Sequence, residues 1–122
     1  MKLPRIIMIL LLISSFVMMI GSCKKSAEKT DYYTDLPIAG FTWTGNDGAA
    51  PVTVSFVNTS ENADSYEWNF GDGYSSIQRD PQHVYHNTGT DSVLYLVVLK
   101  ATESTSGFFD RKSKTIVIKP GG

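Results

Sequence analysis

From Ile38 onward, apolar and polar residues alternate along the chain in short runs separated by turn residues. Segment 52–58, VTVSFVN, places Val52, Val54 and Phe56 on one face, and segment 65–70, SYEWNF, has the same pattern. Such alternation is typical of half-buried β-strands. Further segments of this character are 38–44, 74–78, 83–86, 92–102 and 112–119, and none has a helical period. The pattern predicts an all-β domain of six or seven strands, folded as an antiparallel β-sandwich.

The first 22 residues have the organisation of a signal peptide. Lys2 and Arg5 form a positively charged start, and an apolar run of fifteen residues from Ile6 to Ile20 follows, broken only by Ser14 and Ser15. A membrane-spanning helix needs about 20 apolar residues, so this run is short for a span. Its length suits the apolar core of a signal peptide.

The sequence IGSC at 20–23 resembles the bacterial lipobox. The resemblance implies cleavage before Cys23, attachment of diacylglycerol to its sulfur and acylation of the new amino group. Two or more acyl chains anchor a protein stably, since each buried methylene contributes about 0.8 kcal/mol. An ordinary secretory signal with an incidental cysteine, or an uncleaved N-terminal anchor, are the alternatives. We expect a lipoprotein signal peptide over 1–22 and a membrane anchor at Cys23.

Residues 24–37, KKSAEKTDYYTDLP, are polar, lack a period and end in a proline. This composition predicts a flexible tether, so that 23–37 comprises the lipidated cysteine and the tether. A coil of this length has an end-to-end distance of about 20 Å, which would keep the domain near the bilayer. Two placements of Tyr32 and Tyr33 are open: against the domain or at the bilayer interface.

Charge and cysteine content exclude several kinds of partner and chemistry. The formal net charge is -1, and without residues 1–22 nine Lys and Arg face twelve Asp and Glu. A chain of this charge, with dispersed basic residues, does not have the electrostatic pattern of a nucleic-acid-binding protein. Cys23 is the only cysteine, so no intramolecular disulfide can form and no thiol remains for catalysis after acylation.

The segment WNFGDG at 68–73 predicts a strand that runs into a tight turn. Trp68 and Phe70 share the inward face. Gly71 and Gly73 tolerate positive φ, and the Asp72 carboxylate can accept backbone N–H bonds. A phosphate-binding loop would need more glycines and a following helix. Asp72 and Asp47 are weak calcium candidates, because the chain lacks the Asp-x-Asp-x-Asp-Gly spacing of a helix-loop-helix calcium loop.

Four segments have a combined pattern that points to a known family: FTW with APVTVSFVNTS (41–60), SYEWNFGDG (65–73), DPQHVYHNTG (80–89) and KTIVI (114–118). Together they resemble the PKD domain, an immunoglobulin-like module common in bacterial surface proteins. The third segment carries Pro81, His83 and Tyr85 at the family's spacing. The resemblance implies an immunoglobulin-like β-sandwich over 38–120. The departure is TGTDSVLYLVV, where Val93 takes the place of the family's tyrosine after two additional residues.

The strand around 93–99 is apolar at both parities. The resemblance to the PKD domain implies that Val93, Tyr95, Val97 and Leu99 face the core. Leu94, Leu96 and Val98 then form an apolar stripe on the outer face. Three such residues in a row are more than the isolated apolar side chains found on ordinary protein surfaces. Neighbouring segments could cover the stripe, or it could be a surface for a partner or a second copy.

No constellation for catalysis emerges from the sequence. His83 and His86 are three apart and point to opposite faces of a strand. There is no Gly-x-Ser-x-Gly motif, and the carboxylates fall mostly in turns without a pair spaced for acid–base work. We therefore expect no enzyme activity and no cofactor. Exposed aromatic residues on a sandwich can stack on sugar rings, and the candidates are Tyr74, Phe108 and Phe109.

These observations predict a bacterial lipoprotein that displays one non-catalytic PKD-like domain for protein or carbohydrate binding. The alternative is a structural spacer of the envelope with no specific ligand. Lys24 follows the cysteine where an aspartate would favour retention in the inner membrane, so the outer membrane is the expected location.

Overall fold

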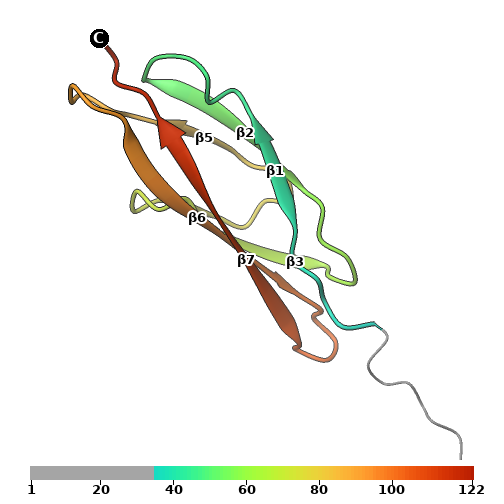
Figure 1. Ribbon diagram of the computed structural model, residues 1–122. Helices are drawn as coiled ribbons and strands as arrows, with labels where there is room; N and C mark the ends of the chain where they lie inside the picture. Colours follow the sequence, from blue (N-terminus) through green and yellow to red (C-terminus); the bar gives the residue numbers. More distant parts are fainter. Residues whose placement is uncertain (1–34) are drawn as a thin grey trace, which may run out of the picture. The chain divides into compact units, whose positions relative to one another are not determined.

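The computed structural model describes residues 35–122 (Figure 1). Cys23, Tyr32 and Tyr33 lie outside the described residues, as do the predicted signal peptide and most of the predicted tether. The described part of the chain has seven strands: β1 (Phe41–Thr44), β2 (Val52–Asn58), β3 (Ser65–Asn69), β4 (Ser75–Ser76), β5 (Gln82–Tyr85), β6 (Val93–Thr102) and β7 (Phe109–Ile118). Between residues 35 and 122, no helix is long and apolar enough to cross a bilayer.

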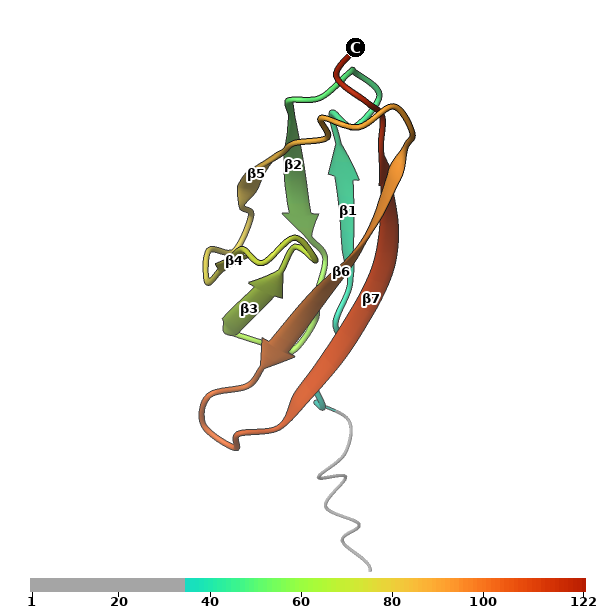
Figure 2. The ribbon, with the colours of Figure 1, turned by 90° about the vertical axis from the view of Figure 1, so that its left-hand side faces the viewer.

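The strands form two antiparallel sheets that face one another (Figures 1 and 2). One sheet has the order β1-β2-β5, and the other has the order β4-β3-β6-β7. Each sheet turns one face toward the other and the opposite face toward solvent, as expected of a β-sandwich. The predicted fold class is confirmed.

The strand bounds differ from the expected segments mainly at three places. The strand expected over 38–44 begins only at Phe41, because Ile38 instead forms an isolated bridge with Glu61. The segment 74–78 yields only the two residues of β4, which pair with the end of β3. The last strand begins at Phe109 rather than at 112, because β7 pairs with β6 along ten positions. The register across this hairpin extends the strand beyond its apolar residues.

The core is an aromatic cluster between the two sheets. The ring of Trp68 lies 5.2 Å from that of Phe41 and 5.5 Å from that of Phe56, and Phe70 lies 5.4 Å from Phe56. Tilted and edge-on pairs at these distances are the favoured arrangements of aromatic rings. The indole nitrogen of Trp68 donates a hydrogen bond of 2.9 Å to the carbonyl of Gln78, so the buried ring leaves no polar atom unpaired.

Strand β6 separates an inner from an outer face. Val97, Leu99 and Ala101 are fully buried and Tyr95 packs against the core, which agrees with the expected parity. Val93 was expected in the core, but 37% of its surface is exposed. It is the first residue of β6 and lies at the end of the sheet, where fewer neighbours cover it.

Two side chains of β7 link the sheets along the seam between β7 and β1. The Lys114 ammonium donates a hydrogen bond to the carbonyl of Phe41 and lies over the rings of Phe41 and Trp43. The Asp110 carboxylate accepts a hydrogen bond of 2.9 Å from the backbone N–H of Ala39. These contacts position the segment that leads into β1 against the last strand.

Candidate functional site

The turn at residues 70–74, which follows β3 and is called the signature turn below, is built around two glycines with positive φ. Gly71 has φ 85° and Gly73 has φ 95°, a region that residues with a side chain rarely adopt. A Cβ on Gly71 would lie 2.6 Å from the carbonyl oxygen of Leu96, whereas a Cβ on Gly73 would meet no atom within 4 Å. The backbone of the turn therefore packs directly against β6 at Gly71. At Gly71 a side chain would clash with β6, whereas at Gly73 only the positive φ disfavours a side chain.

Asp72 connects this turn to β5. Its Oδ2 lies 2.6 Å from His83 Nε2, and its Oδ1 accepts a hydrogen bond of 3.3 Å from the N–H of Tyr74. The His83 ring stacks on Phe70 with centroids 4.2 Å apart. A part-buried pair of this geometry orients both groups and joins the two sheets. His83 thus has its partner in Asp72, while His86 is exposed.

Tyr85, at the end of β5, contacts the first residue of the signature turn. Its hydroxyl donates a buried hydrogen bond of 2.9 Å to the carbonyl of Phe70. Burial raises the pKa of the Tyr85 hydroxyl, and the charge of Asp72 raises it further. The Tyr85 hydroxyl therefore stays protonated and can donate its hydrogen bond to Phe70. Four residues of this region are buried in the sandwich: Trp68, Phe70, Pro81 and Tyr85. Gly71, Asp72 and Gly73 form the turn, and His83 is bound to Asp72.

The two calcium candidates lie in separate parts of the structure. Asp47 is in the loop between β1 and β2, where its backbone carbonyl accepts a hydrogen bond of 3.1 Å from the Lys119 ammonium. The Asp72 carboxylate is engaged by His83. Among residues 35–122, no group of three His, Cys, Asp or Glu side chains could hold a metal ion.

The outer face of β6 and β7 carries the expected apolar stripe. Leu94 is 66% exposed and Leu96 is 54% exposed, and Val117, which pairs with Leu94, is exposed beside them. Val98 was expected to belong to this stripe, but it is half-buried. Asn69, the last residue of β3, pairs with Val98, so Val98 has a strand on each side, whereas Leu94 and Leu96 have only β7 beside them.

The aromatic candidates lie at two places. Phe108 and Phe109, at the turn between β6 and β7, are 55% and 51% exposed, and Tyr74 is exposed after the signature turn. The Lys100 ammonium lies 5.1 Å and the Arg111 guanidinium 4.7 Å from the centre of the Phe109 ring. Phe109 thereby positions two cations on the outer face, while Phe108 and Tyr74 keep large exposed areas.

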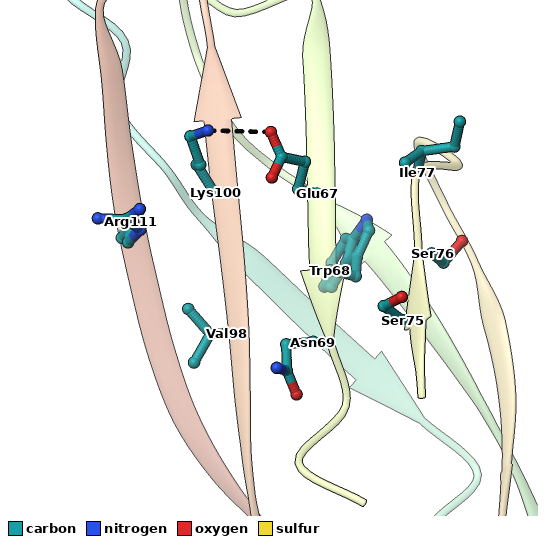
Figure 3. A pocket seen from close by; sticks show the side chains of 9 residues that line it. All are labelled: Glu67, Trp68, Asn69, Ser75, Ser76, Ile77, Val98, Lys100 and Arg111. Carbon is teal, nitrogen blue, oxygen red and sulfur yellow. Dashed lines mark hydrogen bonds and ion pairs between the residues drawn. The ribbon is translucent and has the colours of Figure 1, made fainter. Parts of the chain in front are cut away.

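A groove of about 520 Å³ lies on the outer face of the four-stranded sheet (Figure 3). It crosses all four strands and combines charged, polar and apolar side chains. The Lys100 ammonium, on β6, lies 2.9 Å from a carboxylate oxygen of Glu67 on β3. The residues that line it are Glu67, Trp68, Asn69, Ser75, Ser76, Ile77, Val98, Lys100 and Arg111.

Sequence reasoning did not identify this groove. Alternation along β3 identified the inward residues Trp68 and Phe70, and Glu67, Asn69 and Arg111 were not among the candidate site residues. The missing information was the register between β6 and β7, which pairs Lys100 with Arg111 and Val98 with Ser113. Parity along β7 would have placed Arg111 on the same face as Phe109.

The turn between β6 and β7 is closed by Glu103. Its carboxylate accepts hydrogen bonds of 2.8 Å from the N–H groups of Thr105 and Ser106. A hydrogen bond from the Ser106 side chain, followed by those from the N–H groups of Thr105 and Ser106, lowers the pKa of Glu103 to about 2. The N–H of Glu103 also donates a hydrogen bond of 2.9 Å to the carbonyl of Phe108, so the turn holds the backbone at Phe108.

Comparison with known proteins places the chain in a family. A family model for the PKD domain matches residues 34–118. The PKD1 domain of Vibrio anguillarum Epp is 28% identical with a TM-score of 0.57, the match covering 70% of this chain and 95% of that one. The PKD1 domain of the Vibrio cholerae metalloprotease PrtV is 30% identical with a TM-score of 0.56, covering 69% and 98%.

A third similar structure is described as belonging to carbohydrate-binding modules of the β-sandwich superfamily with promiscuous specificity. It is 25% identical with a TM-score of 0.60, and the match covers 70% of this chain but only 35% of that one. The likeness therefore concerns about a third of that protein's length. With its two facing sheets and its signature turn, this chain belongs to the PKD domain family.

Proposed function

We propose that this chain is a lipid-anchored protein of the bacterial envelope whose PKD domain binds glycan without acting on it. The signal-peptide pattern over 1–22 and the lipobox-like residues ending at Cys23 support the anchor, and Lys24 supports an outer-membrane location. The absence of a paired acid and base in the sequence supports a non-catalytic role.

One observation carries the binding proposal: the groove on the outer face holds hydrogen-bonding and apolar groups side by side. Glu67, Asn69 and Ser75 offer acceptors and donors to hydroxyl groups, and Val98 and Ile77 offer apolar contact. A sugar ring presents apolar C–H groups on its faces and hydroxyls around its rim. Ligand sites combine placed polar groups with apolar surface. Here six of the nine lining residues are polar or charged, which suits a ligand rich in hydroxyl groups.

The third structural neighbour adds support of a different kind, because its description names carbohydrate binding for a β-sandwich of similar fold. Fold similarity alone does not specify a ligand, so the groove remains the basis of the proposal.

A glycan array probed with residues 24–122 tests this function. The fragment is self-sufficient, because the hydrophobic core lies within 35–122 and the similar PKD1 domains were crystallised as separate domains. We expect Ser75→Leu, which narrows the groove, to weaken binding by about tenfold or more. Thr53→Leu, at an exposed position of β2 in the other sheet, is the matched control and should bind normally. Silence on the array and in a pulldown with envelope extract would favour the spacer instead.

The apolar stripe of Leu94, Leu96 and Val117 favours a second candidate function, contact with a protein. Its exposed residues lie beyond the end of β3, next to the groove rather than within it. Apolar patches of this kind on a soluble domain mark interaction surfaces. Capture of a protein by the unmodified fragment but not by its Leu96→Lys variant would establish this function.

The anchor has an independent test. Cys23→Ser in the full chain is expected to move the protein from the membrane fraction to the soluble fraction, because the acylated residue is removed. Retention of the variant in membranes would contradict lipidation at Cys23.

A further inference from the structure

The groove contains a guanidinium group that has no acidic partner among residues 35–122. In the part of the chain that the structure describes, the ion pairs are Arg79 with Asp80, His83 with Asp72, and Lys100 with Glu67. Glu67 is the only carboxylate in the groove lining, and Lys100 engages it. Arg111 therefore adds a positive charge to the groove that no carboxylate within 35–122 balances through an ion pair.

The position of Arg111 prepares it for an anion. Its guanidinium contacts the Phe109 ring through a cation–π interaction at 4.7 Å. Such a contact restrains the long side chain and leaves the N–H donors available for hydrogen bonds. A guanidinium whose position is already restrained loses less conformational entropy on binding a carboxylate, which it can hold through two parallel hydrogen bonds.

This positive charge is local. Residues 35–122 contain ten Asp and Glu against six Lys and Arg, so the domain as a whole repels polyanions. Any affinity for an acidic polymer must therefore come from a particular place on the surface. Figure 3 shows Arg111 on the β7 side of the groove, with Lys100 and the polar side chains of β3 and β4 across from it.

We propose that the groove selects glycans that carry carboxylate groups, such as uronic acid polymers. Arg111 binds the carboxylate, and the Lys100–Glu67 pair with Asn69 and Ser75 meets the hydroxyls. This inference rests on the proposed glycan binding and adds to it the chemical class of the ligand.

A matched pair of polymers tests the inference. Polygalacturonate oligosaccharides and their methyl-esterified forms share a backbone and differ in the carboxylate charge. By calorimetry with residues 24–122, we expect the free acid to bind about tenfold tighter, as one charge-assisted bidentate contact implies. Raising the salt concentration from about 0.05 M to about 0.5 M should reduce this preference by screening.

Two variants distinguish a specific role of Arg111 from a general effect of positive charge on the domain. Arg111→Gln should abolish the preference for the free acid while the melting temperature stays within a few degrees, because the side chain is exposed. Lys112→Gln removes the same charge from the neighbouring residue, which has the opposite parity on β7, and should retain the preference.

Each contrary outcome has a distinct meaning. Equal binding of both forms, or an unchanged preference in Arg111→Gln, overturns the inference and leaves glycan binding standing. A silent array together with silence for both polymers overturns the inference and the proposed function. Competition by polyglutamate as effective as that by polygalacturonate shows that the groove reads acidic chains of any backbone, and it overturns the assignment to glycans.

Discussion

The two faces of β6 are both rich in apolar residues, yet they have different environments. On the inner face, Val97 and Leu99 are fully buried against the aromatic cluster. On the outer face, Leu94 and Leu96 keep more than half of their surface in contact with solvent. The difference arises because the β1-β2-β5 sheet covers the inner face, whereas no described strand covers the outer one. The residue composition of β6 therefore does not show which face is buried. The position of the second sheet decides this.

The strongest test of this contrast compares neighbouring residues on β3. Trp68→Ala removes an inward ring from the aromatic cluster and should lower the free energy of unfolding by about 3–5 kcal/mol. Glu67→Ala, on the outer face, loses only an ion pair in which the Glu67 side chain is largely exposed, and should cost at most about 1 kcal/mol. Urea denaturation of both variants measures the difference. Similar losses in the two would show that the indole is not a central part of the core.

Glycine substitutions test the place where the signature turn meets β6. Gly71→Ala forces a Cβ against the Leu96 carbonyl at positive φ and should destabilise the domain by at least about 2 kcal/mol. Gly73→Ala has a similar φ but open space around it, and about 1 kcal/mol is expected. Thermal melts of the pair separate contact from conformational strain. Equal midpoints would mean that the turn can move away from β6.

Adjacent substitutions on β6 address the outer stripe directly. Leu96→Lys places an ammonium in solvent and should change stability by no more than about 0.5 kcal/mol. The same change at Val97 buries an unpaired charge and should prevent folding. Circular dichroism reports both outcomes, and sedimentation shows whether Leu96→Lys also removes any self-association of the parent chain. Unfolding of the Leu96 variant would reassign this residue to the core.

The smallest expected effect concerns the turn that joins the two strands of this outer face. Hydrogen bonds from Ser106 and Thr105 lower the pKa of Glu103 to about 2 from the ordinary 4.5. A carboxylate with a lowered folded-state pKa stabilises the fold above the unfolded value and loses that contribution as pH falls through the folded value. The melting difference between the parent chain and Glu103→Gln should thus be constant above about pH 4.5 and shrink toward about pH 2. A difference that is independent of pH would show that the carboxylate charge does not close the turn.

Much of the fold was predictable because its signals are local. Alternation at Trp68 and Phe70 identified the inward face of β3, and the two glycines identified the turn. The partner of Asp72 was not predictable, because His83 reaches it across the gap between two sheets. The groove escaped prediction for the same reason, since Glu67, Lys100 and Arg111 meet only through the register of three strands.

The Lys114 contact with Phe41 has a consequence for solubility. Strand β7 is the last strand of its sheet, and the free edge of a ten-residue strand is a template on which another chain could add a strand. An incoming chain would have to displace the ammonium from the Phe41 carbonyl and from two aromatic rings before it could pair there. The same lysine that joins the two sheets should therefore hinder the pairing of a second chain with this edge.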